Sequence, residues 1–476
     1  MKIYGILSDA RLALIIVALA MLCTWSQAQE TTTDGWMNKA AAFSNNGSTE
    51  EAISAYDQVL MIDPKNVTAW RRKALELQIS GKENESAMAL ETALGLIDEG
   101  LKEDPEDAKA WYLRSLTLES LGRHEDSISA SENALRLYNR SLEQNPNDAS
   151  SWRGKAEILY KTGKTDEGLQ ALDKALDIDP KNIDLLSRKG EFLQFIGRYN
   201  ESLEVFDQVL ELLPADDVAG RAEIWLAKVQ TLDFAGRRGE AAEALDAVTD
   251  LDPKNVAAWR MKAGYLGFDG RYDESLAAYE QALRLDPTDI RTLSEKAGLL
   301  SRAGRHNESL DAYDKAIELM ASGGSKELVQ SLEGKADALL KAGRRDEAQQ
   351  TFSMAVDASE DALKRDRGDV SLVLMKARAL FKSGEFDKAI ESYDQVIEMA
   401  SSPGSFYASR AWIGKGDALL MQGRSMQALA AYDRAIELNP IYSDAWHGRG
   451  EAQRALGLVQ EAHESFYVAE RLGHET

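Results

Sequence analysis

Side chains suited to acid–base, nucleophilic or metal chemistry are sparse and scattered in this chain of 476 residues. No H-E-x-x-H pattern, paired-cysteine motif or nucleophile motif surrounds the five histidines, which are His124, His306, His447, His463 and His474. The one cysteine, Cys23, lies in an apolar N-terminal stretch, and a single thiol can form neither a disulfide nor a paired-cysteine metal site. The sequence therefore predicts a protein that is not an enzyme and has no catalytic, cofactor-binding or metal-binding residues.

The charge balance narrows the class of partner. Acidic residues number 79 against 56 basic ones, which gives a net charge of -23 and a pI near 4.8. Nucleic-acid binding requires clustered Lys and Arg that neutralise phosphates, so this composition argues against it. An acidic surface also repels anionic lipid, and it suits either a basic partner or a plain solvated exterior. We expect a protein or peptide ligand, with membrane contact only through an uncleaved N-terminus.

Basic residues recur at a regular spacing and could carry binding chemistry of their own. The twelve positions are Lys39, Lys73, Arg114, Lys155, Lys189, Lys228, Lys262, Lys296, Lys335, Lys376, Lys415 and Arg449. Acidic residues recur in the same way at positions that include Asp57, Asp207, Asp314 and Asp433. The two series predict a ladder of ion pairs, each contributing about 0–1 kcal/mol when exposed. The alternative is a basic ribbon that binds an anionic ligand.

These side chains belong to a longer repeat, which must position them. The pattern is W-x-x-K-A, then a glycine eleven residues after the first position and a small residue five residues after the glycine. Its copies begin at Trp36, Trp70, Trp111, Trp152, Leu186, Trp225, Trp259, Leu293, Leu332, Val373, Trp412 and Trp446. An array of repeats buries its core between neighbouring units, so it leaves no separate domain for an active site.

One copy shows why each repeat predicts a helical hairpin. Trp259, Ala263 and Leu266 form an i, i+4, i+7 stripe along one face of a helix. Gly270 ends that helix because glycine readily adopts positive φ. A second apolar stripe follows and ends before Pro287, which cannot continue a helix. All nine prolines lie between copies, so the array is predicted to be wholly α-helical.

The series Trp, small, Leu, Gly, small, aromatic, small and Pro at a 34-residue spacing resembles the tetratricopeptide repeat, from about residue 33 to residue 472. The resemblance implies an all-α fold, an α-α superhelix that is a solenoid of stacked antiparallel helix hairpins. It also implies a concave groove that is lined by the first helices and binds peptide segments. The basic residue three positions after each repeat start departs from the family, which more often has an apolar residue there.

The distance between copies predicts where the repeats differ. Some copies carry seven extra residues, nearly two turns, so we expect longer second helices after Trp70, Trp111 and Leu332. Others carry five, which would rotate a helix face by about 140°. Looped joints are therefore predicted before Trp225, Leu332 and Trp412, at residues 214–220, 321–325 and 401–405. Whether these joints act as hinges or are packed loops stays open.

The resemblance assigns some first-helix side chains to the groove. The candidates are Tyr112, Tyr160, Phe195, Phe234, Phe268, Phe381, Arg71, Arg153 and Arg260. Aromatic and arginine side chains commonly form binding hot spots, although the rings could instead pack on the neighbouring repeat. Family members that capture terminal carboxylates use paired Lys and Asn, an arrangement absent from this sequence.

The N-terminus predicts export. Lys2 and Arg11 precede a 14-residue apolar stretch, and residues 26–28 supply small residues at the spacing that signal peptidases prefer. We expect a signal peptide or anchor at 1–28, a linker at 29–35, the array at 36–472 and a tail at 473–476. The protein is then secreted or associated with the cell envelope.

Six Asn-x-Ser/Thr sequons on an exported chain suggest N-glycosylation. They stand at Asn46, Asn66, Asn84, Asn139, Asn200 and Asn307. Three of them share one repeat position at which the Ser is also the required small residue, so packing explains half of the set.

Two functions follow from these observations. The first is a scaffold or adaptor without enzymatic activity that holds peptide or protein segments in the groove outside the cytoplasm. The alternative is a structural component of the cell envelope, self-associating through its ends and glycosylated.

Overall fold

The computed structural model describes residues 32–45, 48–80, 82–320, 325–400 and 406–473. The predicted signal peptide with Cys23, the sequon at Asn46 and most of the segments 321–325 and 401–405 lie outside the described residues. Over the described ranges the regular structure is entirely α-helical, from α2 to α25. The chain divides into two compact units, and the boundary falls between Arg237 and Arg238.

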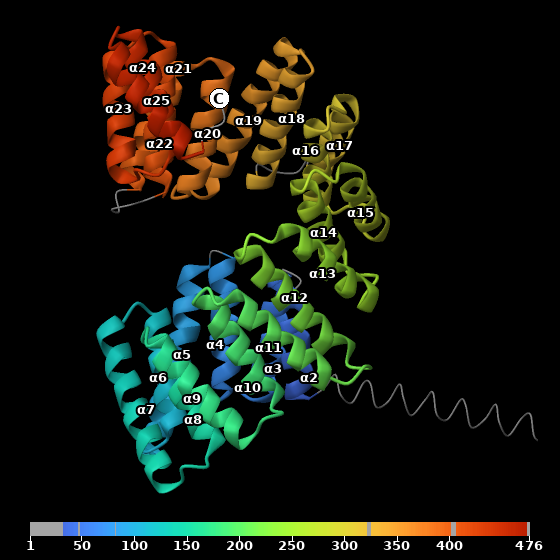
Figure 1. Ribbon diagram of the computed structural model, residues 1–476, viewed down its shortest axis with the longest axis vertical. Helices are drawn as coiled ribbons and strands as arrows, with labels where there is room; N and C mark the ends of the chain where they lie inside the picture. Colours follow the sequence, from blue (N-terminus) through green and yellow to red (C-terminus); the bar gives the residue numbers. More distant parts are fainter. Residues whose placement is uncertain (1–31, 46–47, 81, 321–324, 401–405, 474–476) are drawn as a thin grey trace, which may run out of the picture. The chain divides into compact units, whose positions relative to one another are not determined.

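Unit 1 is a stack of antiparallel helical hairpins, each with a first helix that begins before the repeat start and a second helix that follows the turn glycine (Figure 1). Its helices are α2 (Thr33–Asn45), α3 (Thr49–Ile62), α4 (Val67–Ile79), α5 (Glu83–Glu103), α6 (Ala108–Ser120), α7 (His124–Gln144), α8 (Ala149–Lys161), α9 (Thr165–Ile178), α10 (Ile183–Phe195), α11 (Tyr199–Leu212) and α12 (Val218–Phe234).

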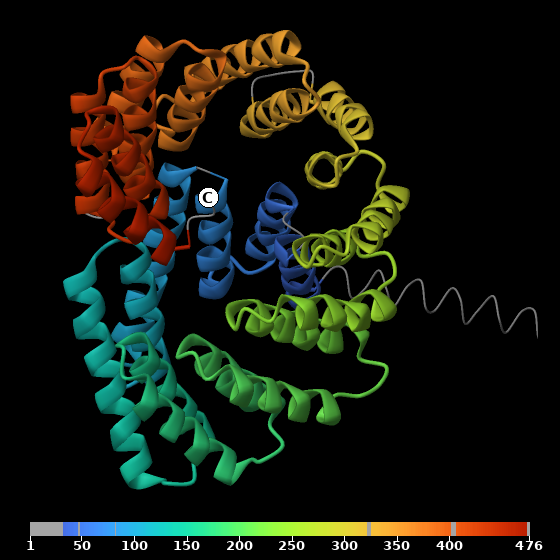
Figure 2. The same cartoon turned by 45° about the horizontal axis from the view of Figure 1, so that its top comes forward.

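Unit 2 starts with the second helix of the sixth copy and continues with six complete hairpins, which follow one another in chain order (Figure 2). Its helices are α13 (Arg238–Leu251), α14 (Val256–Phe268), α15 (Tyr272–Leu285), α16 (Ile290–Arg302), α17 (His306–Leu319), α18 (Lys326–Lys341), α19 (Arg345–Arg365), α20 (Val370–Ser383), α21 (Phe386–Met399), α22 (Phe406–Met421), α23 (Ser425–Leu438), α24 (Ser443–Ala455) and α25 (Val459–Arg471). The predicted all-α solenoid of helix hairpins is confirmed.

The connectors between hairpins follow from their Asx-Pro sequences. Pro64 cannot continue α3, and the side chain of Asn66 accepts a hydrogen bond from the N–H of Ala69 at 3.0 Å, which caps α4. The same cap recurs at Asp107, Asp148, Asn182, Asp217, Asn255, Asp289 and Asp369. Eight first helices therefore begin at an Asx residue that the sequence specifies.

The turn glycines within the hairpins adopt the predicted left-handed conformation, with φ between 72° and 87°. The ten described ones are Gly122, Gly163, Gly197, Gly236, Gly270, Gly304, Gly343, Gly384, Gly423 and Gly457. A side chain at these positions would strain the backbone, so this part of the pattern is a conformational requirement.

The small residue that follows each turn is buried where the two helices of a hairpin cross. Where it is serine it also makes a bond: Ser275 Oγ donates to the carbonyl of Ala263 at 2.6 Å. Four further serines bond in the same way, namely Ser86, Ser127, Ser202 and Ser309. Both the size and the hydroxyl of these serines therefore hold the hairpin closed.

The large second-helix residue packs on the first helix of the next hairpin. At Gly154 a Cβ atom would lie 2.2 Å from Cζ of Tyr138, and at Gly414 it would lie 2.3 Å from Cζ of Tyr393. Such distances are shorter than any van der Waals contact, so these first helices need glycine where the ring inserts.

The copies with seven extra residues confirm the predicted long second helices. α5, α7 and α19 each have 21 residues, whereas most second helices have 14. The added turns of α5 place Leu94, Ile97 and Leu101 in the core. A near-integral number of turns keeps the buried face in register.

The predicted looped joints are wrong in part. Val218–Gly220 belong to α12, and α12, α18 and α22 have 17, 16 and 16 residues against 13 for α4. Most of the five extra residues thus extend the first helix at its N-terminal end. An added turn there leaves the register of all later residues unchanged, so the buried face is not rotated. The unit boundary at Arg237 does not coincide with the joint before Trp225.

The predicted linker at 29–35 also needs a correction, because Thr33–Gly35 form the first turn of α2. The other first helices likewise begin at least three residues before their repeat start, and Asp34 suits the positive end of the helix dipole. None of the helices in the described ranges combines the length and apolarity needed to cross a bilayer.

Candidate interaction surface

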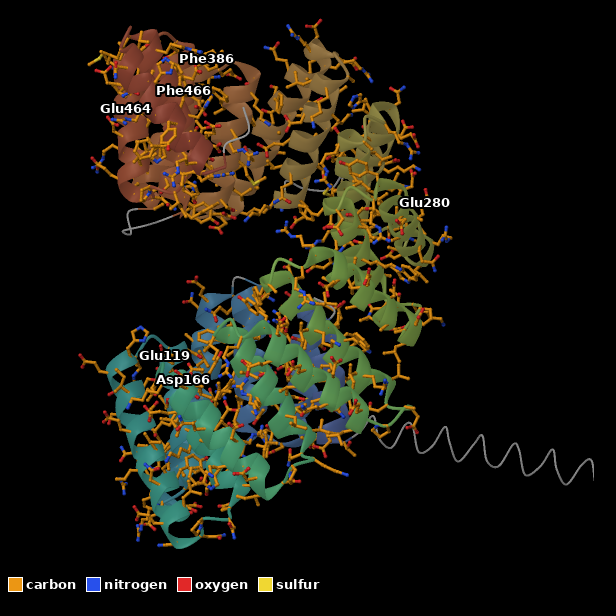
Figure 3. All side chains as sticks on the ribbon, in the orientation of Figure 1. Glu119, Asp166, Glu280, Phe386, Glu464 and Phe466 are labelled. Carbon is orange, nitrogen blue, oxygen red and sulfur yellow. The ribbon has the colours of Figure 1, made fainter. Side chains whose placement is uncertain are left out.

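The ladder of ion pairs orients the first helices and is confirmed. Ten basic residues at the fourth position of a copy pair with an acidic residue of the preceding second helix: Lys73, Arg114, Lys189, Lys228, Lys262, Lys296, Lys335, Lys376, Lys415 and Arg449. Lys73 Nζ lies 2.6 Å from Asp57 Oδ1. Lys296 Nζ lies 3.3 Å from Oε1 of Glu280, which is labelled in Figure 3. These cations neutralise the protein's own carboxylates, which argues against a basic ribbon for an external anion.

One rung of this ladder lacks its acid. The position on α7 that would face Lys155 is Asn139, and no ion pair joins Lys155 to any described residue. Lys155 keeps its contact with the ring of Trp152, at 5.2 Å from the centroid. The exception shows that the ring contact does not depend on the acid.

The tryptophans have a role that the sequence reading missed. Eight indole rings lie under the basic residue three positions later, with the cation 4.4–5.6 Å from the ring centroid. Five of them also donate Nε1–H to the connector proline carbonyl six residues earlier, as Trp70 does to Pro64 at 2.9 Å. The W-x-x-K spacing places the two side chains one helical turn apart, and it could have predicted this contact.

Within each unit the first helices approach one another more closely than the second helices do. α6 contacts α8, α10 contacts α12, and α16, α18, α20, α22 and α24 contact one another in succession, whereas contacts between successive second helices are sparse in the described chain. Each unit therefore curves toward its first helices. We call their exposed surface the first-helix face of that unit.

Aromatic side chains mark the first-helix face of unit 1. Phe195 is 69% exposed and Phe234 58% exposed. The ring of Tyr160 stacks on Phe192 at 4.1 Å and meets Phe195 edge to face at 5.0 Å. Phe195 is thus the outer edge of a stack whose inner ring, Phe192, is buried.

Polar contacts connect three first helices of unit 1 at the same stack. Arg188 donates from Nε and Nη2 to the two carboxylate oxygens of Glu157, at 2.7 and 2.6 Å. Tyr112 donates to Glu157 at 3.4 Å, and burial raises the pKa of Tyr112. The Arg188 guanidinium also lies over the rings of Tyr160 and Phe192. This arrangement fixes the orientation of Tyr160, on which Phe195 rests.

The three candidate arginines differ in how their charge is compensated. Arg153 pairs with Asp184, and Arg260 in unit 2 pairs with Asp289 at 3.1 Å. Arg71 forms no ion pair with any described residue, and its Nε is buried without a hydrogen-bond partner. Burial lowers the pKa of Arg71. Arg71 is therefore the candidate whose charge the fold leaves uncompensated.

Among the candidates in unit 2, the exposed aromatic is Phe268, which is 66% exposed and lies between the guanidinium groups of Arg238 and Arg302, at 5.1 and 5.8 Å from its ring centroid. The remaining candidate, Phe381, packs against the core of unit 2, and its ring centroid lies 5.7 Å from that of Phe386. The structure thus separates one packed ring from the three exposed ones.

Unit 2 also carries carboxylates with incomplete partners. Glu333 is 6% exposed, its Oε1 has no hydrogen-bond partner, and Arg378 lies 3.9 Å from its other oxygen. Burial raises the pKa of Glu333. Burial also raises the pKa of Asp417 to about 6, although Tyr432 donates a hydrogen bond to it at 2.6 Å. Both carboxylates belong to first helices.

The sequons occupy different local structures. Asn66 caps α4, and Asn200 accepts a hydrogen bond from Arg237 at 3.1 Å. Asn84, Asn200 and Asn307 are exposed in the first turn of a second helix, whereas Asn139 is half-buried. In the described ranges no group of three or more His, Cys, Asp or Glu side chains is arranged to hold a metal ion.

The repeated hairpins, with a core shared between neighbours and an open first-helix face, define a helical repeat solenoid. Tetratricopeptide repeat models match residues 33–66, 106–181, 226–290, 288–361, 374–440 and 413–473. The chain therefore belongs to the tetratricopeptide repeat family, whose fold is that of a protein-interaction scaffold. The matched models describe repeat units rather than a catalytic domain.

Individual relatives are distant. An uncharacterized protein of Methanocaldococcus jannaschii is 43% identical over 53 residues, which are 11% of this chain and 62% of that protein. The crystal structure of yeast Tom70 matches at 17% identity and a TM-score of 0.43, over 93% of this chain and 92% of that one. A tetratricopeptide repeat protein from Parabacteroides merdae matches at 15% identity and a TM-score of 0.41, over 59% and 98% of the two chains. These likenesses concern the fold alone.

Proposed function

We propose that this protein is a scaffold without enzymatic activity that binds peptide or protein segments on its first-helix faces. The observation that carries the proposal is the exposure of Phe195 and Phe234 in unit 1 and of Phe268 in unit 2. Burying an exposed phenylalanine ring against a partner is favourable by about 1.5–3 kcal/mol, and nothing in the core requires these rings. Such rings are typical anchors of a binding surface.

The test removes these rings and leaves the repeat intact. Phe195→Ala, Phe234→Ala and Phe268→Ala, combined in one chain, should abolish capture of peptides from a displayed random library. The far-ultraviolet circular dichroism spectrum and the melting temperature should not change. The matched control is Met61→Ala on α3, a second helix, where the side chain is equally exposed. A loss of helicity in the triple variant would assign the rings to the core and contradict the proposal.

We further propose that the protein works outside the cytoplasm, secreted or attached to the cell envelope. The support is the basic, apolar and small-residue series at 1–28. Mass spectrometry of the protein from its native cells should find a chain that begins after residue 28. A chain that retains residues 1–28 and fractionates with membranes would indicate an uncleaved anchor instead.

A second candidate function is self-association as a glycosylated envelope component. It is favoured by α25, the last helix, where Val459 is 61% and Tyr467 59% exposed. Sedimentation of the mature chain at micromolar concentration distinguishes the two functions, because a monomer contradicts self-assembly. Glycosylation at Asn46, Asn66, Asn84, Asn139, Asn200 or Asn307 predicts a mass decrease after enzymatic removal of N-linked glycans.

A further inference from the structure

Five aromatic side chains in the described ranges are more than half exposed, and they differ between the two units. Phe195 and Phe234 belong to unit 1, whereas Phe268, Phe406 and Tyr467 belong to unit 2. In unit 2 each of these rings lies under a guanidinium group of this chain, at 5.1–6.0 Å from the ring centroid. No described residue places a cation over Phe195 or Phe234. The chain therefore covers its exposed rings with cations in unit 2 and leaves them uncovered in unit 1.

Phe268 shows which positions of the repeat supply a cation to such a ring. Phe195 and Phe268 occupy the same repeat position, and each is the last residue of its first helix. Phe268 receives Arg302 from that position of the following copy and Arg238 from the start of the preceding second helix, α13. The two corresponding positions around Phe195 hold uncharged side chains, Phe234 and Thr165. The ring of Phe195 therefore lacks the partners that its counterpart in unit 2 has.

The basic side chains that adjoin Phe195 in the repeat are engaged elsewhere. Lys161, at the same position on α8, donates to the hydroxyl groups of two buried serines in the preceding hairpin. Arg198, in the turn after Phe195, donates from Nε to Glu201 at 2.7 Å. Arg188 lies over the other two rings of the stack. Phe195 contacts that stack but is 69% exposed, so its ring remains accessible to a partner.

The charge around this ring favours a cation as the occupant. The protein has a net charge of -23, and an aromatic ring face attracts positive charge. Glu191 lies four residues before Phe195 on α10, hence on the same helix face, and its side chain is 51% exposed. One oxygen of Glu191 accepts from Arg188, and the other accepts no hydrogen bond from any described residue. A cation over Phe195 would therefore lie beside an exposed carboxylate.

The cations within the chain indicate that the occupant is arginine rather than lysine. Those over the exposed rings of unit 2 are all arginines, namely Arg238, Arg302, Arg410 and Arg471. Lysines instead lie over the half-buried tryptophans and the buried Phe352. A guanidinium group is planar and less strongly hydrated than an ammonium group, so it stacks on an exposed ring at a lower desolvation cost.

From these observations we propose that the first-helix face of unit 1 binds a basic peptide segment through an arginine. The guanidinium group of that arginine lies over Phe195 and donates to the open oxygen of Glu191. Phe234 offers a second uncovered ring on α12, the first helix that contacts α10. The inference rests on the proposed scaffold function and assigns the ligand class of one of its surfaces.

The experiment selects random twelve-residue peptides, joined at both ends to constant sequence, on the full mature chain. The selected pool should be enriched in arginine more than in lysine. A selected peptide is then made with acetyl and amide ends, once with its arginine and once with citrulline, the uncharged isostere. The citrulline peptide should bind the native chain about fivefold more weakly. This comparison uses the native chain alone, so it does not depend on how a variant folds.

Variants of the ring separate a contact with its π face from a plain apolar contact. Phe195→Leu keeps an apolar side chain and should weaken the arginine peptide about fivefold, whereas Phe195→Trp should bind at least as tightly as the native chain. Citrulline should cause little further loss in Phe195→Leu. The matched control is Phe406→Leu, which removes an exposed ring that Arg410 already covers and should bind as the native chain does.

A further variant tests the sign of the charge. Phe234→Arg introduces a guanidinium group at the repeat position from which Arg302 covers Phe268. It should weaken the arginine peptide more than Phe234→Ala does, because the new side chain competes for Phe195 and repels the ligand. Tighter binding by Phe234→Arg would overturn the inference.

The outcomes also separate this inference from the proposed function. A pool enriched in apolar or acidic residues without arginine overturns the basic ligand and leaves the scaffold function standing. Equal binding of the arginine and citrulline peptides likewise overturns the contact between the guanidinium group and the ring. A pool without any enrichment contradicts both the inference and the proposed function.

Discussion

The two units share one repeat pattern, yet their first helices differ in the buried polar atom that lacks a hydrogen-bond partner. Among the described residues of the first helices in unit 1, this atom is Nε of Arg71, a cation. In unit 2 it is Oε1 of Glu333, a carboxylate whose other oxygen lies 3.9 Å from Arg378. The ladder, the turn glycines and the buried small residues are common to both units. The two units thus share the residues that pack the hairpins together. They differ in first-helix side chains that this packing does not require.

The largest effect should come from the shared framework and should be equal in the two units. Gly154→Ala in unit 1 and Gly414→Ala in unit 2 each drive a Cβ atom into a tyrosine ring, and each should lower the free energy of unfolding by about 3 kcal/mol. Urea titration followed by circular dichroism measures the change. Gly264→Ala, where no heavy atom lies within 4 Å, is the control and should stabilise by about 0.5–1 kcal/mol. Tolerance of the change in only one unit would show that the frameworks differ.

The next effect should be confined to unit 2 and depend on pH. The folded-state pKa of Asp417, about 6, lies above its ordinary value of 3.8, so the folded state holds this proton more tightly. The free energy of unfolding then falls as pH rises from about 4 to about 6. Asp417→Asn should remove that dependence and stabilise by about 2 kcal/mol at pH 8.

Arg71 provides the contrast in unit 1, because its guanidinium stays charged throughout this range. Thermal melts of Asp417→Asn and Arg71→Gln at pH 4, 6 and 8 make the comparison. Equal gains for Asp417→Asn at all three values would mean that the carboxylate does not titrate in this window.

A smaller effect should again be common to both units. Lys73→Met and Lys415→Met each remove a ladder ion pair and a ring contact, and each should cost about 1 kcal/mol, less in high salt. Lys155→Met, which loses only the ring contact, should cost about 0.5 kcal/mol. Equal losses at all three sites would mean that the ion pairs contribute nothing.

The smallest effect should come from supplying the acid that is missing opposite Lys155 in unit 1. Asn139→Asp places an acid opposite Lys155 and should stabilise by about 0.5 kcal/mol. The gain should vanish in a Lys155→Met background, and the double-mutant cycle measures this coupling. A gain that persists without the lysine would assign the effect to the helix itself.

The sequence predicts the features that recur in every copy. The glycine φ values, the buried small residues and the ladder follow from spacing alone, because each serves a contact repeated along the array. The long α5, α7 and α19 follow from a near-integral number of turns. The five-residue insertions were harder to place, since an insertion upstream of the buried stripe lengthens a helix without disturbing its face.

The interaction surface is less predictable than the frame. Phe195 is exposed and Phe381 is packed against the core, and this difference can be seen only from the positions of the neighbouring helices. The lack of a hydrogen-bond partner for the buried Nε of Arg71 likewise depends on which side chains the surrounding helices bring near it. The repeat pattern describes contacts within one copy and with its neighbours. It therefore cannot show which side chains are left exposed or without a partner.

The placement of the tryptophans has a consequence for optical measurements. Five indoles donate a hydrogen bond to the connector that precedes their hairpin, and all eight described indoles lie beside a cation, so their emission should change when these contacts open. The three consecutive hairpins from α16 to α21 contain none, because residues 260–411 lack tryptophan. Repeat arrays can open locally. Intrinsic fluorescence would therefore register opening over α2–α9, α12–α15 and α22–α25, and it would remain silent when α16–α21 unfold, a loss visible only to circular dichroism.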